Sequence, residues 1–212
     1  MPMRACVAVM MLLVSNASPP QELMRPSIIG IEPLRTNVAE AGRILGIAPW
    51  ARESDGGESS PVVMCYSSIA RDSFLLIQSG AAGGYGKHDV TGFVLTEREP
   101  KLRPVPRSID RSSRAVSSNL CRDSALVSRG LELSNGLRLG MSQAEVVALL
   151  GPPTSTRGAT LTYRRDDRVS LPDAGSGSPG EGDSQAGDYA VVAVELKDEH
   201  VYAVRVERSN MF

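Results

Sequence analysis

The chain has 212 residues, which is enough for one domain or two small ones with a buried core. Its 23 basic and 24 acidic side chains give a formal net charge of −1. This balance argues against a nucleic-acid binder, because such proteins normally carry a basic excess.

The first residues have the pattern of an export signal. Arg4 supplies a positive start, residues 5–14 are apolar, and small residues up to Ala17 form a cleavage site. The apolar run is shorter than the ~20 residues that span a bilayer. We expect residues 1–17 to be a signal peptide cleaved near Ala17, which leaves a periplasmic or secreted protein. A buried N-terminal helix is the alternative interpretation.

Two cysteines, Cys65 and Cys121, remain once Cys6 is removed with the signal. In an oxidising compartment such a pair predicts a disulfide bond, which would stabilise the protein by ~3–5 kcal/mol in the entropic model. Two unrelated buried thiols are the alternative. Neither cysteine lies in a Cys-x-x-Cys pair, and His88 and His200 are the only histidines. We therefore expect no catalytic thiol, no metal site and no cofactor.

The pattern at residues 142–151 predicts a short helix. Ser142 and Glu145 have the spacing of a capping box, and Gly151, followed by two prolines, ends the helix. Because two turns of helix are unstable alone, this one must pack against other elements.

β-branched residues predict strands on both sides of this helix. We expect an additional strand before it at 125–133, and strands after it at 159–165, 189–197 and 201–208. Residues 166–188 are rich in Gly, Ser, Pro and Asp, a composition typical of a disordered loop.

The first half of the chain repeats this plan. Asn37, Glu40 and Gly46 each lie 105 residues before Ser142, Glu145 and Gly151. Strand-like segments follow again at 61–68, 73–80 and 90–98. This shared order indicates an internal duplication.

The expected fold class is therefore α+β, with two tandem units of a short helix packed on an antiparallel sheet. The expected boundaries are 27–99 for the first unit, 100–120 for a linker and 121–212 for the second unit.

Residues 136–153 contain Gly-Leu-Arg-Leu-Gly-Met-Ser, then Ala-Glu-Val, then Leu-Leu-Gly-Pro-Pro. This pattern resembles the SmpA/OmlA (BamE) family of small envelope modules and, in its two copies, the β-lactamase inhibitor protein. The resemblance covers 136–208 well and 30–98 more weakly. It implies a helix laid on an antiparallel sheet, and its residues cap, turn and pack rather than perform chemistry.

These observations predict an exported, non-catalytic protein-binding module, either an envelope accessory or assembly factor or an inhibitor of a secreted enzyme. Its partner would be another envelope or secreted protein, with no transmembrane segment and no nucleic acid involved. We expect contacts from an open sheet face and from loops, with Trp50 and Tyr85 as candidate contact residues. The alternatives are a small periplasmic hydrolase that uses His88 or His200 beside an acid, and a carrier of an apolar ligand.

Overall fold

In the computed structural model, which describes residues 21–53, 61–79, 89–105, 120–169 and 186–211, the two predicted helices begin at their capping residues. Helix α1 (Val38–Leu45) follows Asn37, whose side chain accepts a hydrogen bond from the Glu40 backbone N–H. Helix α2 (Gln143–Leu150) follows Ser142, and Ser142 and Glu145 form the complete capping box. Both helix predictions are confirmed, because local side-chain oxygens satisfy N–H groups that the helix itself leaves free.

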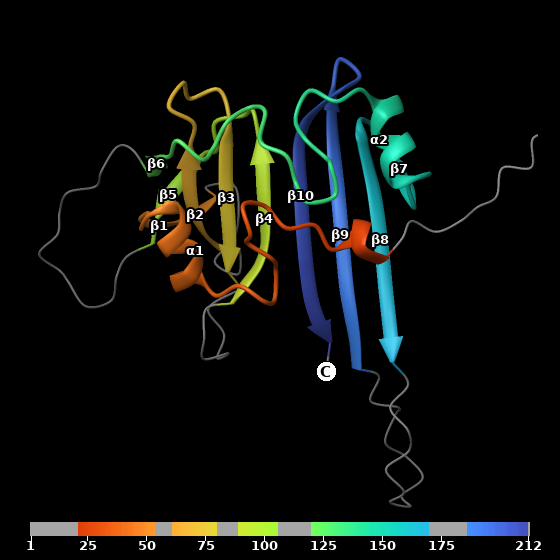
Figure 1. The fold of residues 1–212 in the computed structure, drawn as a ribbon, viewed down its shortest axis with the longest axis horizontal. Coiled ribbons are helices and arrows are strands. Elements are labelled where there is room, and N and C mark those ends of the chain that lie inside the picture. The colour runs from red at the N-terminus through yellow and green to blue at the C-terminus, as the bar shows by residue number, and fades with distance from the viewer. Residues whose placement is uncertain (1–20, 54–60, 80–88, 106–119, 170–185, 212) are drawn as a thin grey trace, which may run out of the picture.

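The rest of the described chain forms one ten-stranded sheet (Figure 1). Its order is β5-β1-β2-β3-β4-β10-β9-β8-β7, and β6 pairs with β2 off this path. A 3-10 helix, η1 (Gln21–Met24), precedes α1. The strands are β1 (Trp50–Glu53), β2 (Val62–Ser67), β3 (Phe74–Ser79), β4 (Val90–Thr96), β5 (Leu102–Pro104), β6 (Cys121–Asp123), β7 (Ser155–Arg157), β8 (Thr160–Val169), β9 (Ala186–Lys197) and β10 (His200–Met211).

The predicted α+β class is wrong, because antiparallel strands dominate the described chain. The two α-helices have 8 residues each, whereas β8, β9 and β10 have 10, 12 and 12. These long strands extend into the segment expected to be a loop: β8 runs to Val169 and β9 starts at Ala186. Residues 170–185 lie outside the described residues. The predicted strands were too short because pairing with a neighbouring strand holds even polar residues in a sheet.

Short strands account for the other differences between the predicted and the observed strands. Strands β1, β5, β6 and β7 have only three or four residues, which is too few to show alternation in the sequence. The strand expected at 125–133 is absent, and that range contains turns and an isolated bridge residue instead. The strand lies just before it, at β6, and pairs in parallel with β2, with Cys121 opposite Cys65.

The two halves of the chain meet where β4 pairs with β10. Five antiparallel residue pairs, from Gly92↔Glu207 to Thr96↔Ala203, join them into the same sheet. Outward from this pair lie β3, β2, β1 and β5 on one side, and β9, β8 and β7 on the other. The internal duplication that the sequence indicates stays a prediction.

The first half of the sheet is strongly curled. The Arg205 guanidinium on β10 lies 4.0 Å from the Glu53 carboxylate on β1, although β2, β3 and β4 separate these strands. In a flat sheet, strands four places apart would be about 19 Å apart. The inside of the curl holds a small apolar cluster that consists of Ala51, Val63, Cys65, Phe74, Leu76, Val94 and Cys121.

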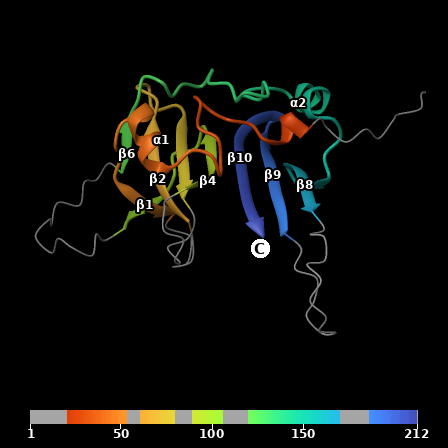
Figure 2. The same ribbon diagram turned by 60° about the horizontal axis from the view of Figure 1, so that its bottom comes forward.

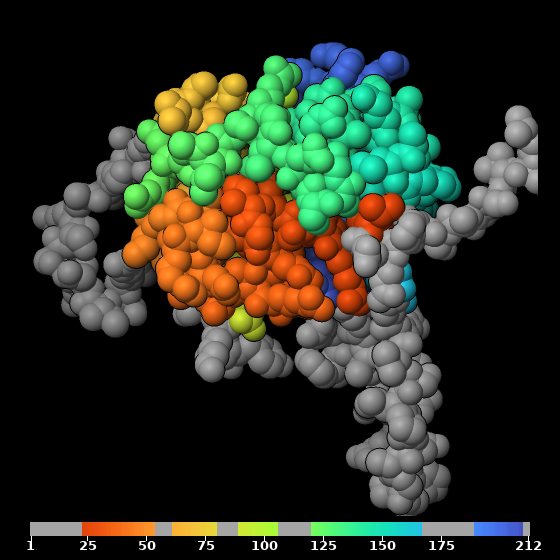
Figure 3. Space-filling view, viewed as in Figure 1, coloured from red at the N-terminus to blue at the C-terminus, as the bar shows by residue number. Residues whose placement is uncertain are grey.

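The main core lies on the other face of the sheet. Both helices, the N-terminal segment and the chain between β6 and α2 cover this face (Figures 1 and 3). They contribute buried side chains such as Ile28, Ala41, Leu139 and Val146. Burial of these apolar side chains is the main force that holds the covering segments on the sheet.

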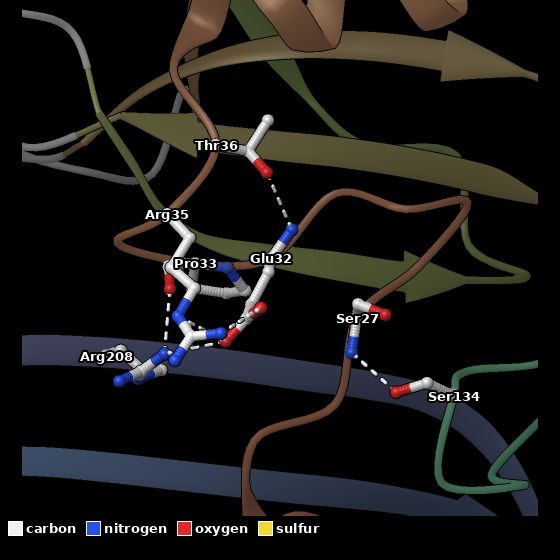
Figure 4. A network of polar contacts seen from close by, with 7 residues as sticks. All are labelled: Ser27, Glu32, Pro33, Arg35, Thr36, Ser134 and Arg208. Atoms are coloured by element: carbon white, nitrogen blue, oxygen red, sulfur yellow. Dashed lines mark hydrogen bonds and ion pairs between the residues drawn. The ribbon is translucent and has the colours of Figure 1, made fainter.

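Polar contacts fix the N-terminal segment above the sheet (Figure 4). The Arg208 side chain of β10 is only 6% exposed and donates to the Pro33 carbonyl at 2.9 Å and to the Glu32 carboxylate at 3.4 Å. Ser27 and Ser134 exchange two hydrogen bonds of 2.8 and 2.9 Å. The segment is thereby tied both to β10 and to the chain that leads into α2.

Candidate functional site

The described chain exposes four large apolar side chains, and the segments that carry them meet at β6. Two come from the end of α1, one from the turn between β2 and β3, and one from the chain just after β6. They are Ile44, Ile47, Ile69 and Leu126, at 36%, 76%, 74% and 47% exposed. In Figure 1, β6 lies at the left edge of the sheet, with α1 below it and the turn between β2 and β3 above it, and in Figure 2 β6 again lies next to α1.

Arg122 of β6 connects β6 with the end of α1. Its guanidinium donates to the Ile47 carbonyl at 2.8 Å. It also lies against Gly46, where an added Cβ would be 2.8 Å from the Arg122 Cζ atom. Since Gly46 also has a φ of 86°, a residue with a side chain would be strained there, and the guanidinium would have to move away from an added Cβ. The guanidinium therefore has a defined place beside Ile47.

Asp123 of β6 connects it with the turn that carries Ile69. The Ser67 hydroxyl donates to the Asp123 carboxylate at 2.7 Å, and Arg71 pairs with the same oxygen at 3.5 Å. The Ser67 hydrogen bond, and after it the Arg71 charge, lowers the pKa of Asp123. Asp123 is therefore ionised at neutral pH, and its charge balances that of Arg71.

A disulfide bond between Cys65 and Cys121 holds β6 on β2. The pairing that the sequence predicted is thus present, with the two Cα atoms 4.4 Å apart. Just beyond it, the Ser124 N–H donates to the Ser67 carbonyl at 2.9 Å, which places the chain that carries Leu126 beside the end of β2. We call Ile44, Ile47, Ile69, Leu126, Arg71, Arg122 and Asp123 the β6 surface. In the space-filling view, the segments that carry it form adjoining orange, green and yellow areas (Figure 3).

A pocket of about 250 Å³ lies at the opposite half of the sheet, beside the β9–β10 turn. Its lining is mostly charged or polar and consists of Glu97, Arg129, Gly140, Lys197, Asp198, His200, Val201 and Tyr202. Glu97 and Arg129 already form an ion pair of 2.8 Å. Such a lining does not suit an apolar ligand, so the pocket does not favour the carrier interpretation.

Of the two histidines considered for a hydrolase, the structure describes His200, which is not placed beside an acid in a catalytic arrangement. His200 Nδ1 lies 2.7 Å from the backbone carbonyl of Asp198, and the structure shows no carboxylate hydrogen-bonded to the ring. His88 lies outside the described residues. Within the described ranges, no group of three or more His, Cys, Asp or Glu side chains is placed to hold a metal ion.

The structure describes one of the two candidate contact residues. Trp50 is half-buried and packs against the main core, so the structure gives it a packing role, and its contact with a partner stays a prediction. Tyr85 lies outside the described residues. The open sheet face expected to bind a partner is filled, in the first half, by the apolar cluster inside the curl.

Sequence reasoning missed the β6 surface for a physical reason. Its four apolar residues are scattered between positions 44 and 126, and they come together only because β6 joins the edge of β2. The disulfide was the one available indication, since it predicts that the chain around Cys121 lies beside β2.

No helix in the described residues has the length and apolar character needed to cross a membrane. No family model, curated protein or solved structure matches this chain.

Proposed function

We propose that this chain is an exported, non-catalytic protein-binding module that contacts its partner through the β6 surface. The observation that carries the proposal is the gathering of all four large exposed apolar side chains of the described residues on segments that meet at β6. Exposed apolar side chains are unremarkable when scattered singly, but grouped ones mark interaction sites.

Two features support export. The disulfide bond is compatible with a periplasmic or secreted protein. The N-terminal residues have the signal-peptide pattern with cleavage near Ala17. The resemblance of residues 136–153 to the SmpA/OmlA (BamE) group favours an envelope accessory factor or an inhibitor of a secreted enzyme.

A capture experiment tests the proposal. The tagged mature protein would be used to isolate partners from cross-linked envelope extract, with mass spectrometry as the readout. The test variant is the double substitution Ile47→Asp and Ile69→Asp, which places two charges on the apolar side chains. The control is Ala144→Asp, which adds a carboxylate on the exposed first turn of α2, where a negative charge suits the helix.

We expect one protein that the unmodified chain and the control capture equally and that the double variant loses at least tenfold. Circular dichroism and thermal unfolding would verify that the double variant is folded. Equal capture by the folded double variant would contradict the proposal, and so would the absence of any specific partner.

A further inference from the structure

We propose that the partner's binding segment is apolar and carries a carboxylate that pairs with Arg122. This inference rests on the proposed function and specifies the chemistry of the partner at the same surface. It follows from the charges of the β6 surface and from the way in which Arg122 is held.

Arg122 is the cation that the β6 surface leaves without a counter-charge. Arg71 is balanced by Asp123. Arg122 is exposed, and its hydrogen bond in the described structure goes to a neutral acceptor, the Ile47 carbonyl. A guanidinium has five N–H donors, so most of its donors remain for solvent or for a partner.

The position of Arg122 suits a binding anchor because it is fixed before a partner arrives. The Ile47 carbonyl and the bare backbone of Gly46 hold the guanidinium at the end of α1. A side chain that is already ordered loses less conformational entropy on binding than a mobile one. Arginines of this kind are frequent among the residues that dominate binding energy.

The surroundings of Arg122 define the rest of the partner's segment. Ile44 and Ile47 lie on the α1 side of β6, whereas Ile69 and Leu126 are carried by the segments tied to the other end of β6. An apolar segment that covers Ile47 would exclude water from the Arg122 guanidinium, which is bonded to the Ile47 carbonyl. A carboxylate paired with a guanidinium in such surroundings forms a strong, charge-assisted hydrogen bond.

A protein segment fits this surface better than an anionic lipid. Asp123 follows Arg122 in the same short strand, so its ionised carboxylate lies on the opposite face of β6 from the guanidinium. A membrane of anionic lipids would bring many negative charges close to Asp123, whereas a single partner carboxylate can be placed at Arg122 alone. The surface therefore favours one carboxylate within an apolar segment.

The test uses fluorescent peptides with an apolar sequence, such as alternating Leu and Val, and a central Glu, Gln or Lys. Binding to the disulfide-bonded mature protein is measured by fluorescence anisotropy. We expect the Glu peptide to bind roughly tenfold more tightly than the Gln peptide, and the Lys peptide to bind most weakly. Arg122→Gln should remove the preference for Glu, whereas the control Arg157→Gln, on β7 at the far edge of the sheet, should keep it.

Three results would overturn the inference. They are equal binding of the Glu and Gln peptides, a preference for Glu that persists in Arg122→Gln, and no binding by any peptide at millimolar concentration. Arg122-dependent binding to phosphatidylglycerol vesicles without peptide binding would assign the surface to lipid instead. The capture experiment is independent of these results, because loss of the partner in the Ile47→Asp/Ile69→Asp variant would still support a protein-binding surface.

Discussion

Two buried tyrosines, Tyr66 on β2 and Tyr163 on β8, occupy similar positions in the two halves of the sheet but differ in their hydrogen bonds. The Tyr66 hydroxyl donates to the Gly46 carbonyl at 2.7 Å. The Tyr163 hydroxyl is buried and has no hydrogen-bond partner. A buried hydroxyl without a partner costs free energy, whereas a satisfied one contributes to stability. The tyrosine hydroxyl therefore stabilises the fold in the first half and is unfavourable in the second.

Removal of each hydroxyl should have opposite effects. We expect Tyr66→Phe to lower the free energy of unfolding by about 1–2 kcal/mol, because it leaves the Gly46 carbonyl without its donor. Tyr163→Phe should leave stability unchanged or raise it by up to about 1 kcal/mol. Urea unfolding of both variants measures these changes. A loss of stability in Tyr163→Phe as large as that in Tyr66→Phe would show that the second hydroxyl has a partner.

Tyr66 should also make the protein sensitive to alkali. Burial, partly opposed by the nearby Arg122 charge, raises the pKa of Tyr66 from 10.0 to about 12. The unfolded chain therefore loses this proton at a lower pH than the folded chain. The stability contributed by neutral Tyr66 is complete below pH 10 and is lost as the pH rises from 10 towards 12.

We expect the urea midpoint to fall steeply above about pH 10. In Tyr66→Phe the fall should be smaller, with Tyr163, whose pKa burial also raises, responsible for part of what remains. An unchanged pH profile in Tyr66→Phe would contradict this assignment.

For single residues, the sequence predicted the roles that depend on nearby residues in the chain or on the number of cysteines. Asn37 and Ser142 cap their helices because their partners lie three residues away in the chain. Cys65 and Cys121 were predicted to pair because export leaves an even number of cysteines. The place of Arg122 could not be predicted, since it depends on Gly46 and Ile47, which lie more than seventy residues away in the chain.

Among the strands, short β6 depends on the disulfide for its position more than a long strand would. It has only three residues and pairs with β2 through three residue pairs. The bond between Cys65 and Cys121 closes a separation of 56 residues, which restricts the unfolded chain. The other contacts of this short strand are its three residue pairs with β2 and the hydrogen bonds of Arg122, Asp123 and Ser124, so the disulfide is its one covalent connection to β2.

The variant Cys65→Ala/Cys121→Ala should therefore lose both stability and binding. We expect the free energy of unfolding to fall by roughly 3–5 kcal/mol, as measured by urea unfolding. Partner capture should fall at least tenfold even at temperatures where the variant is folded. Full capture by the folded variant would show that β6 keeps its place without the bond.

The pairing of β4 with β10 depends on a close approach at Gly92. A Cβ atom there would lie 2.3 Å from the Val206 carbonyl oxygen and 3.0 Å from the Gln78 side chain. We expect Gly92→Ala to lower the free energy of unfolding by at least about 2 kcal/mol, because backbone atoms would have to move. Gly130→Ala is the matched control, since no heavy atom lies within 4 Å of its added Cβ. Equal urea midpoints for the two variants would contradict the close approach.

In the whole molecule, one sheet joins the two helix-plus-sheet units that were predicted from the sequence. The helices and most long strands were visible in the sequence because they rest on local patterns. The pairing of β4 with β10 and the curl that brings Arg205 to Glu53 involve residues far apart in the chain. No local pattern encodes such contacts, so the β-rich fold and the β6 surface emerged only in the structure.

Site-specific photo-crosslinking in intact cells would show whether the β6 surface binds a protein partner. A photoreactive amino acid would replace Ile69 on the β6 surface or, as the control, the exposed Ala144 on α2. We expect a discrete crosslinked product of one mass from position 69, lost when Arg122→Gln and Ile47→Asp are added, and none from position 144. No product from position 69, or the same product from both positions, would contradict it.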